Sequence, residues 1–97
     1  MSKAAIIADE KGQLIVSGEL NFATIVGLWK QSLPLLTNRS PIDIDLSQVT
    51  LSNSAGIALL IEWLKYAKQN NKAITFHGIS AQLQSIAAVA GVALSSH

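Results

Sequence analysis

Small polar residues followed by alanine and glycine, Ser52-Asn53-Ser54-Ala55-Gly56, form the segment of this 97-residue sequence best suited to chemistry. They lie where a predicted strand leads into a predicted helix, whose first backbone N–H groups favour an anion or a hydrogen-bond acceptor. Two interpretations of Ser54 are compatible. In one, Ser54 caps the helix and Gly56 permits close packing. In the other, Ser54 presents an exposed hydroxyl for phosphorylation or for a partner.

The sequence lacks the residues that usually carry out hydrolysis or bind nucleotides. A nucleophile elbow around Ser54 would need glycine at position 52, which is serine. The two histidines, His77 after a predicted strand and His97 at the C-terminus, are poorly placed to act as a base. No glycine-rich loop with lysine follows a strand. We therefore expect a protein with no catalytic residues.

The sequence also offers few groups that could bind a metal or a cofactor. Asp43 and Asp45 share one face of a predicted strand and could approach a cation, but a third ligand is not evident. The absence of cysteine excludes disulfides and thiolate zinc sites, and it is compatible with a reducing compartment such as the cytoplasm. We expect neither a metal nor a cofactor.

Length and composition indicate one folded domain over residues 1–97, with 49% hydrophobic and 13% charged residues. A net charge of +1 without a basic run argues against nucleic-acid binding. The longest apolar run, residues 55–61, is too short to span a bilayer. The mean hydropathy of +0.38 is high for a small domain and suggests that a partner covers part of the surface.

The elements needed to position these residues follow from hydrophobic periodicity. Residues 4–8 and 13–17 are predicted strands joined by a turn at 9–12. A helix is predicted from Phe22, capped by Asn21 and disturbed near its end by Pro34. Its expected buried stripe comprises Phe22, Ile25, Val26, Trp29, Leu33 and Leu36.

The second half of the chain alternates in the same way. Ile42, Ile44 and Leu46 alternate with polar residues as in a half-buried strand. A helix over about 54–69, a strand over 73–77 and a helix over 80–90, stopped by Gly91, complete the pattern. The order ββαβαβα predicts an α/β fold with a central mixed sheet and helices packed on it.

The predicted helix over 54–69 carries two apolar stripes. The first is expected to face the sheet and comprises Ile57, Leu60, Ile61 and Leu64. The second comprises Leu59, Trp63 and Tyr66. Either a neighbouring helix covers this second stripe, or it extends a partner surface that begins at Ser54. Both interpretations stay open.

Three motifs at matching intervals over nearly the whole chain resemble the STAS family, which includes the anti-sigma-factor antagonists. They are Gly18-Glu19-Leu20-Asn21, Ile44-Asp45-Leu46-Ser47 and Asn53-Ser54-Ala55-Gly56-Ile57. The detailed pattern is most similar to the small cytoplasmic STAS subunits of Mla lipid-transport ABC systems. It rests on Leu28-Trp29, Gly56-Ile57-Ala58-Leu59-Leu60, Ala67-Lys68 and Phe76-His77-Gly78.

This resemblance implies a non-enzymatic subunit that binds the ATPase of an ABC phospholipid transporter and reaches the permease through the complex. The subunit would be cytoplasmic, peripheral to the inner membrane, and would support transporter assembly and activity in maintaining outer-membrane lipid asymmetry. The expected partner-binding residues are Ser52, Asn53, Ser54, Ala55, Gly56, Leu59, Trp63 and Tyr66.

The family resemblance also places the phosphoacceptor of STAS switches on Ser54. The acidic residues that flank this motif and follow Gly-Glu-Leu are replaced here by Asn53 and Asn21. An amide keeps the acceptor oxygen of a cap but not its charge. We therefore expect a constitutive binding subunit, and the alternative is a phosphorylation-regulated anti-sigma factor antagonist.

Overall fold

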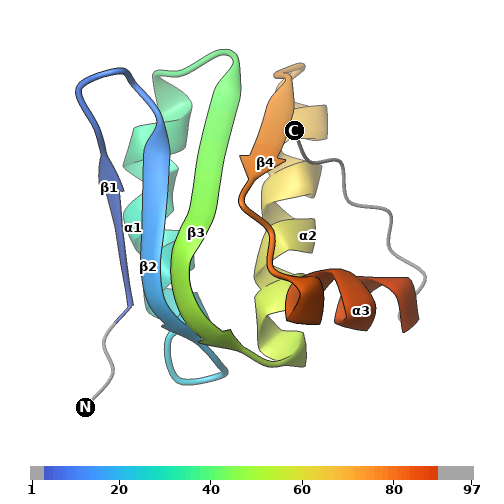
Figure 1. Cartoon of the computed structure of the whole chain (residues 1–97). Helices are drawn as coiled ribbons and strands as arrows, with labels where there is room; N and C mark the ends of the chain where they lie inside the picture. The colour runs from blue at the N-terminus through green and yellow to red at the C-terminus, as the bar shows by residue number, and fades with distance from the viewer. Residues whose placement is uncertain (1–3, 90–97) are drawn as a thin grey trace.

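The computed structural model describes residues 4–89, which form a four-stranded sheet and three helices (Figure 1). The elements are β1 (Ala5–Ala8), β2 (Leu14–Leu20), α1 (Ile25–Thr37), β3 (Ile42–Ser52), α2 (Ser54–Gln69), β4 (Ile74–His77) and α3 (Ala81–Val89). The predicted order and α/β class are confirmed. Ala90, Gly91 and His97 lie outside the described residues.

The sheet has the strand order β1-β2-β3-β4. β1 and β2 form an antiparallel hairpin, whereas β2, β3 and β4 are parallel because the crossovers through α1 and α2 return the chain to the same edge. Asp9 stabilises the hairpin turn, since its Oδ1 accepts from the N–H groups of Lys11 and Gln13 at 2.9 and 2.8 Å. Gly12 supplies the positive φ of 84°.

β3 is longer than predicted, because it continues beyond Leu46 to Ser52. Alternating burial ends near Leu46, and the second half of the strand pairs with Ser17–Leu20 of β2 through shifts in register. Such irregularities break the period of two that identifies a strand from sequence. The extension carries the chain directly to the turn at Ser54.

The helices α1 and α2 lie behind the sheet in the view of Figure 1 and cover the same face of it. Alternate strand residues point toward them into the core, whereas Asp43 and Asp45 are on the opposite face as predicted. The residues that β2 and β3 contribute to the core are Leu14, Val16, Leu20, Ile42, Ile44 and Leu46.

α1 starts later than predicted, and of its predicted stripe only Leu36 is fully buried. Asn21 does supply the expected capping oxygen, but its Oδ1 accepts from the N–H groups of Ala23 and Thr24 and holds a turn in front of the helix. Phe22, 72% exposed, therefore lies outside α1. The buried residues of α1 are Leu28, Ser32 and Leu36.

The ammonium group of Lys72 stabilises the C-terminal end of α1. The helix continues past Pro34 to Thr37, so the proline does not end it. Lys72, which precedes β4, donates from Nζ to the carbonyls of Leu36 and Thr37 at 2.8 and 2.9 Å. A positive charge at a helix C-terminus is favourable because the last carbonyls lack partners within the helix.

Candidate functional site

The turn before α2 is capped by Asn53, not by Ser54. Asn53 has an extended backbone (φ −110°, ψ −167°), and its Oδ1 accepts from the N–H of Ala55 at 2.8 Å. Ser54 is the first helical residue and is exposed. Within the described part of the chain its hydroxyl makes no hydrogen bond. The capping interpretation of Ser54 is therefore wrong, and the exposed-hydroxyl interpretation agrees with the structure.

This arrangement predicts different consequences for two neighbouring alanine substitutions. Asn53→Ala removes the capping oxygen and is expected to destabilise the fold by about 1 kcal/mol. Ser54→Ala removes no contact and should change stability by less than about 0.5 kcal/mol. Urea unfolding followed by far-UV circular dichroism measures both free energies. A larger loss for Ser54→Ala than for Asn53→Ala would contradict this assignment of the cap.

The other small residues of the turn are buried, unlike Ser54. Ser52, Ala55 and Gly56 are buried in the folded chain. A Cβ atom at Gly56 would lie 2.1 Å from Ser52 Oγ and 3.3 Å from the Leu20 side chain, so α2 approaches β2 and β3 closely at this glycine. This confirms the packing role predicted for Gly56. Ser52, Ala55 and Gly56 therefore shape the turn from within the fold, and their contact with a partner stays a prediction.

The second apolar stripe of α2 is covered by α1. Trp63 is fully buried, and its Nε1 donates to Ser32 Oγ of α1 at 2.9 Å. Leu59 is also buried. The prediction that Trp63 is an exposed partner contact is therefore wrong, and so is the exposed placement of Leu59. Tyr66 is only partly buried and packs edge-on against Trp29, with ring centroids 6.4 Å apart.

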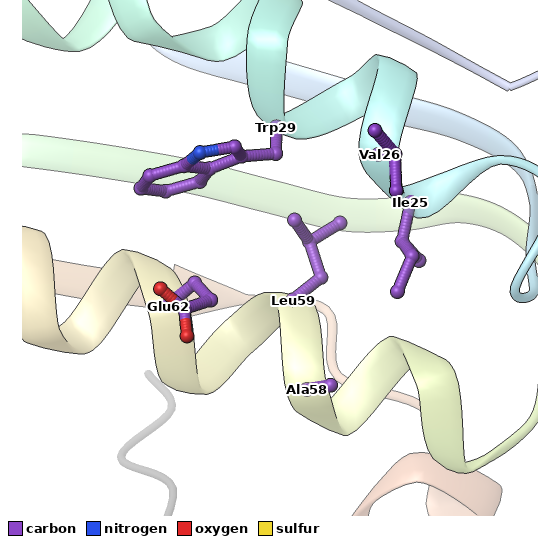
Figure 2. A pocket seen from close by; sticks show the side chains of 6 residues that line it. All are labelled: Ile25, Val26, Trp29, Ala58, Leu59 and Glu62. Carbon is purple, nitrogen blue, oxygen red and sulfur yellow. The ribbon is translucent and has the colours of Figure 1, made fainter.

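Beyond the predicted residues, an apolar pocket opens between α1 and α2, and we call it the α1–α2 pocket. Its volume is about 190 Å³. Figure 2 shows Ile25 pointing from α1 toward α2 and Leu59 pointing from α2 toward α1. They are Ile25, Val26, Trp29, Ala58, Leu59 and Glu62. Sequence reasoning missed this pocket because it assigned Ile25, Val26 and Trp29 to one buried stripe.

The aspartates of β3 are engaged within the protein. Asp43 Oδ1 lies 3.1 Å from His77 Nε2 on β4, and Asp45 Oδ1 accepts from the N–H of Ser47 at 2.8 Å. Over residues 4–89, no group of three His, Cys, Asp or Glu side chains is placed to hold a metal ion. Both aspartates therefore form local contacts, Asp43 with β4 and Asp45 within β3 itself.

The chain thus folds as a small α/β domain in which α1 and α2 cover one face of a mixed sheet and Ser54 is exposed at the start of α2. A family model described as "Mlab, STAS domain" matches residues 4–93. The chain belongs to the STAS family, and the family resemblance drawn from its motifs is confirmed. None of the helices within residues 4–89 is long and apolar enough to cross a membrane.

Solved structures agree with this fold. One is the anti-sigma factor antagonist SpoIIAA in its unphosphorylated form, with a TM-score of 0.72, 9% identity, and coverage of 97% of this chain and 87% of that chain. Another is a serine-to-glutamate variant of Moorella thermoacetica RsbS, with a TM-score of 0.72, 16% identity, and coverage of 99% and 86%. At these identities the likeness concerns the fold alone. No curated protein matches the chain.

Proposed function

We propose that this protein is the non-enzymatic, MlaB-like subunit of an Mla-type ABC phospholipid transporter. It binds the ATPase subunit in the cytoplasm and reaches the permease and the inner membrane only through the complex. By supporting assembly and activity of the transporter, it contributes to outer-membrane lipid asymmetry. The observation that carries this proposal is the match of residues 4–93 to the family model described as "Mlab, STAS domain".

The geometry of the turn supports a binding role. Ser54 is exposed at the start of α2 and does not cap the helix, so a partner can reach its hydroxyl. Asn53 keeps the cap without the negative charge that an aspartate would place beside that hydroxyl. A neutral, preformed turn suits a contact that does not depend on a change of charge.

Co-purification from the native host tests the proposal directly. The tagged full-length protein is purified under native conditions, and the retained proteins are identified by mass spectrometry. We expect an ABC ATPase in near-stoichiometric amount, accompanied by its permease. Retention of a kinase-like anti-sigma factor without an ABC ATPase would overturn the proposal.

A second candidate, a phosphorylation-regulated anti-sigma factor antagonist, is favoured by one observation. The Ser54 hydroxyl is exposed at a helix N-terminus, where the helix dipole would stabilise a phosphate. This candidate predicts that Ser54 of the natively purified protein carries phosphate in part of the molecules. Intact-mass measurement with and without phosphatase treatment distinguishes the two candidates.

Substitution of Ser54 should separate binding from folding. Ser54→Glu places a negative charge at the N-terminus of α2, where the helix dipole is favourable to it. The free energy of unfolding should therefore hardly change. Bulk and charge at the partner contact should weaken ATPase binding by about tenfold or more. Ser54→Gln, of equal size but neutral, is the matched control that separates bulk from charge. Unchanged ATPase affinity of a folded Ser54→Glu protein, measured by titration calorimetry, would remove this turn from the interface.

A further inference from the structure

The α1–α2 pocket is continuous with the surface that carries Ser54. Ala58, which lines the pocket, lies one helical turn beyond Ser54 on the same face of α2. Ile25, on the opposite wall, is the first residue of α1. Both helices begin at the edge of the sheet where the parallel strands β2 and β3 end (Figure 1). A partner seated on the Ser54 turn would therefore reach the pocket.

The size of the pocket limits what can fill it. Its volume is about 190 Å³. A cavity of about 150 Å³ is enough to hold a benzene molecule, whereas sites for complete small ligands usually measure about 300–1,000 Å³. The pocket thus accommodates one large apolar side chain but not a phospholipid or a nucleotide.

The chemistry of the surroundings fits a protein contact. Five of the six lining residues are apolar, and Glu62 supplies the single charge. Its ion pair with Lys65 is long, at 3.6 Å, and both side chains are more than half exposed, so Glu62 can exchange this weak partner for another. Val26 of the pocket wall is itself 58% exposed, and Phe22 and Leu51 (55% exposed) add exposed apolar side chains near the same edge of the sheet. Exposed apolar surface bordered by polar groups is typical of protein interaction sites.

We propose that the ATPase inserts one aromatic or large aliphatic side chain into the α1–α2 pocket and pairs a neighbouring lysine or arginine with Glu62. This inference rests on the proposed function. The competing occupant is Phe22 of a second copy of the chain. The segment around Phe22 contains the acidic Glu19 and no basic residue, so this segment of a second copy supplies no cation to pair with Glu62. The observations therefore favour the ATPase.

Filling the pocket tests the proposal. Ala58 is exposed, so Ala58→Trp should block the pocket without disturbing the core. The matched control is Ala8→Trp, at the end of β1 beside the hairpin turn, where alanine is also exposed. With the purified ATPase, Ala58→Trp should raise the dissociation constant about 30-fold or more and Ala8→Trp less than about twofold. Equal affinities for the two variants would overturn the proposal.

The proposed pairing with Glu62 is tested by reversing its charge and comparing a matched control. Glu62→Lys reverses the single charge of the pocket and should weaken binding about tenfold, whereas Glu10→Lys in the hairpin turn should leave the affinity unchanged. The two substitutions change the net charge of the subunit equally. Equal loss of affinity for both variants would therefore show a general charge effect and contradict the pairing with Glu62.

A spectroscopic measurement on the unsubstituted chain completes the test. The protein contains two tryptophans, Trp29 in the pocket wall and the buried Trp63. After labelling with 5-fluorotryptophan, addition of unlabelled ATPase should shift the fluorine resonance of Trp29, assigned with Trp29→Phe, more than that of Trp63.

The outcomes separate this inference from the proposed function. If the complex forms and the Trp29 resonance does not shift, the pocket is not the contact and the proposed function stands. If no complex forms, the proposed function itself fails. Concentration-dependent dimerisation of the free subunit that moves Trp29 would identify a second copy as the occupant and overturn the proposal.

Discussion

Replacing Trp63 by alanine is expected to destabilise the protein by about 3–5 kcal/mol, the range for truncating a large aromatic side chain in a core. Trp63 is fully buried between α1 and the sheet, and its ring lies 6.4 Å from that of Phe76. Small domains have a total stability of about 5–15 kcal/mol, so this substitution can leave the chain largely unfolded at physiological temperature. Thermal and urea unfolding measure the loss.

Trp63→Phe is the matched control, because it keeps most of the apolar volume and removes the indole N–H. The Ser32 hydroxyl would lose the donor at 2.9 Å but would keep its own hydrogen bond to the carbonyl of Trp29 at 2.7 Å. We expect a loss of about 1–2 kcal/mol, well below that for alanine. If Trp63→Ala folded with nearly native stability and lost only ATPase binding, Trp63 would be an interface residue and its burial would be refuted.

The second large effect is expected at Gly56, where adding one methyl group should destabilise the protein. Alanine normally stabilises a helix by about 1 kcal/mol relative to glycine. At position 56, however, the new Cβ would lie 2.1 Å from Ser52 Oγ and 3.3 Å from the Leu20 side chain. Overpacking of this kind costs about 1–3 kcal/mol, so Gly56→Ala should lower the free energy of unfolding.

Gly27 provides the internal comparison for this prediction. It is a helical glycine in α1 where an added Cβ atom would meet no other part of the protein within 4 Å, so Gly27→Ala should stabilise the protein by about 0.5–1 kcal/mol. Adding Ser52→Ala to Gly56→Ala should recover part of the loss, because it removes the oxygen that clashes with the new methyl group. Stabilisation by both glycine substitutions would show that α2 does not pack closely at Gly56.

The fold was predictable from sequence because its signals are local. The period of two in Ile42, Ile44 and Leu46 identifies β3, and the Asp9–Gly12 turn identifies the β1–β2 hairpin. The end of β3 was not predictable, since its second half pairs through shifted registers that interrupt the period.

The candidate site was predictable in part. Residue types at 52–56 locate the turn and its close-packed glycine, because caps and tight approaches depend on the nearest few residues. Which residue supplies the cap was not evident, since Asn53 and Ser54 both carry a suitable oxygen. The backbone settles it by placing Asn53 in the extended conformation and Ser54 in the first turn of the helix.

The amino-acid sequence by itself determined the order of elements, the α/β class, the family and the position of the turn at residues 52–56. Only the tertiary structure decided which helix faces are buried. α1 begins at Ile25, after the turn held by Asn21, and buries Leu28, Ser32 and Leu36. Ser32 there meets Trp63 of α2. The same placement leaves the pocket between the two helices. These outcomes depend on where a second helix lies, and periodicity within one helix carries no information about that neighbour.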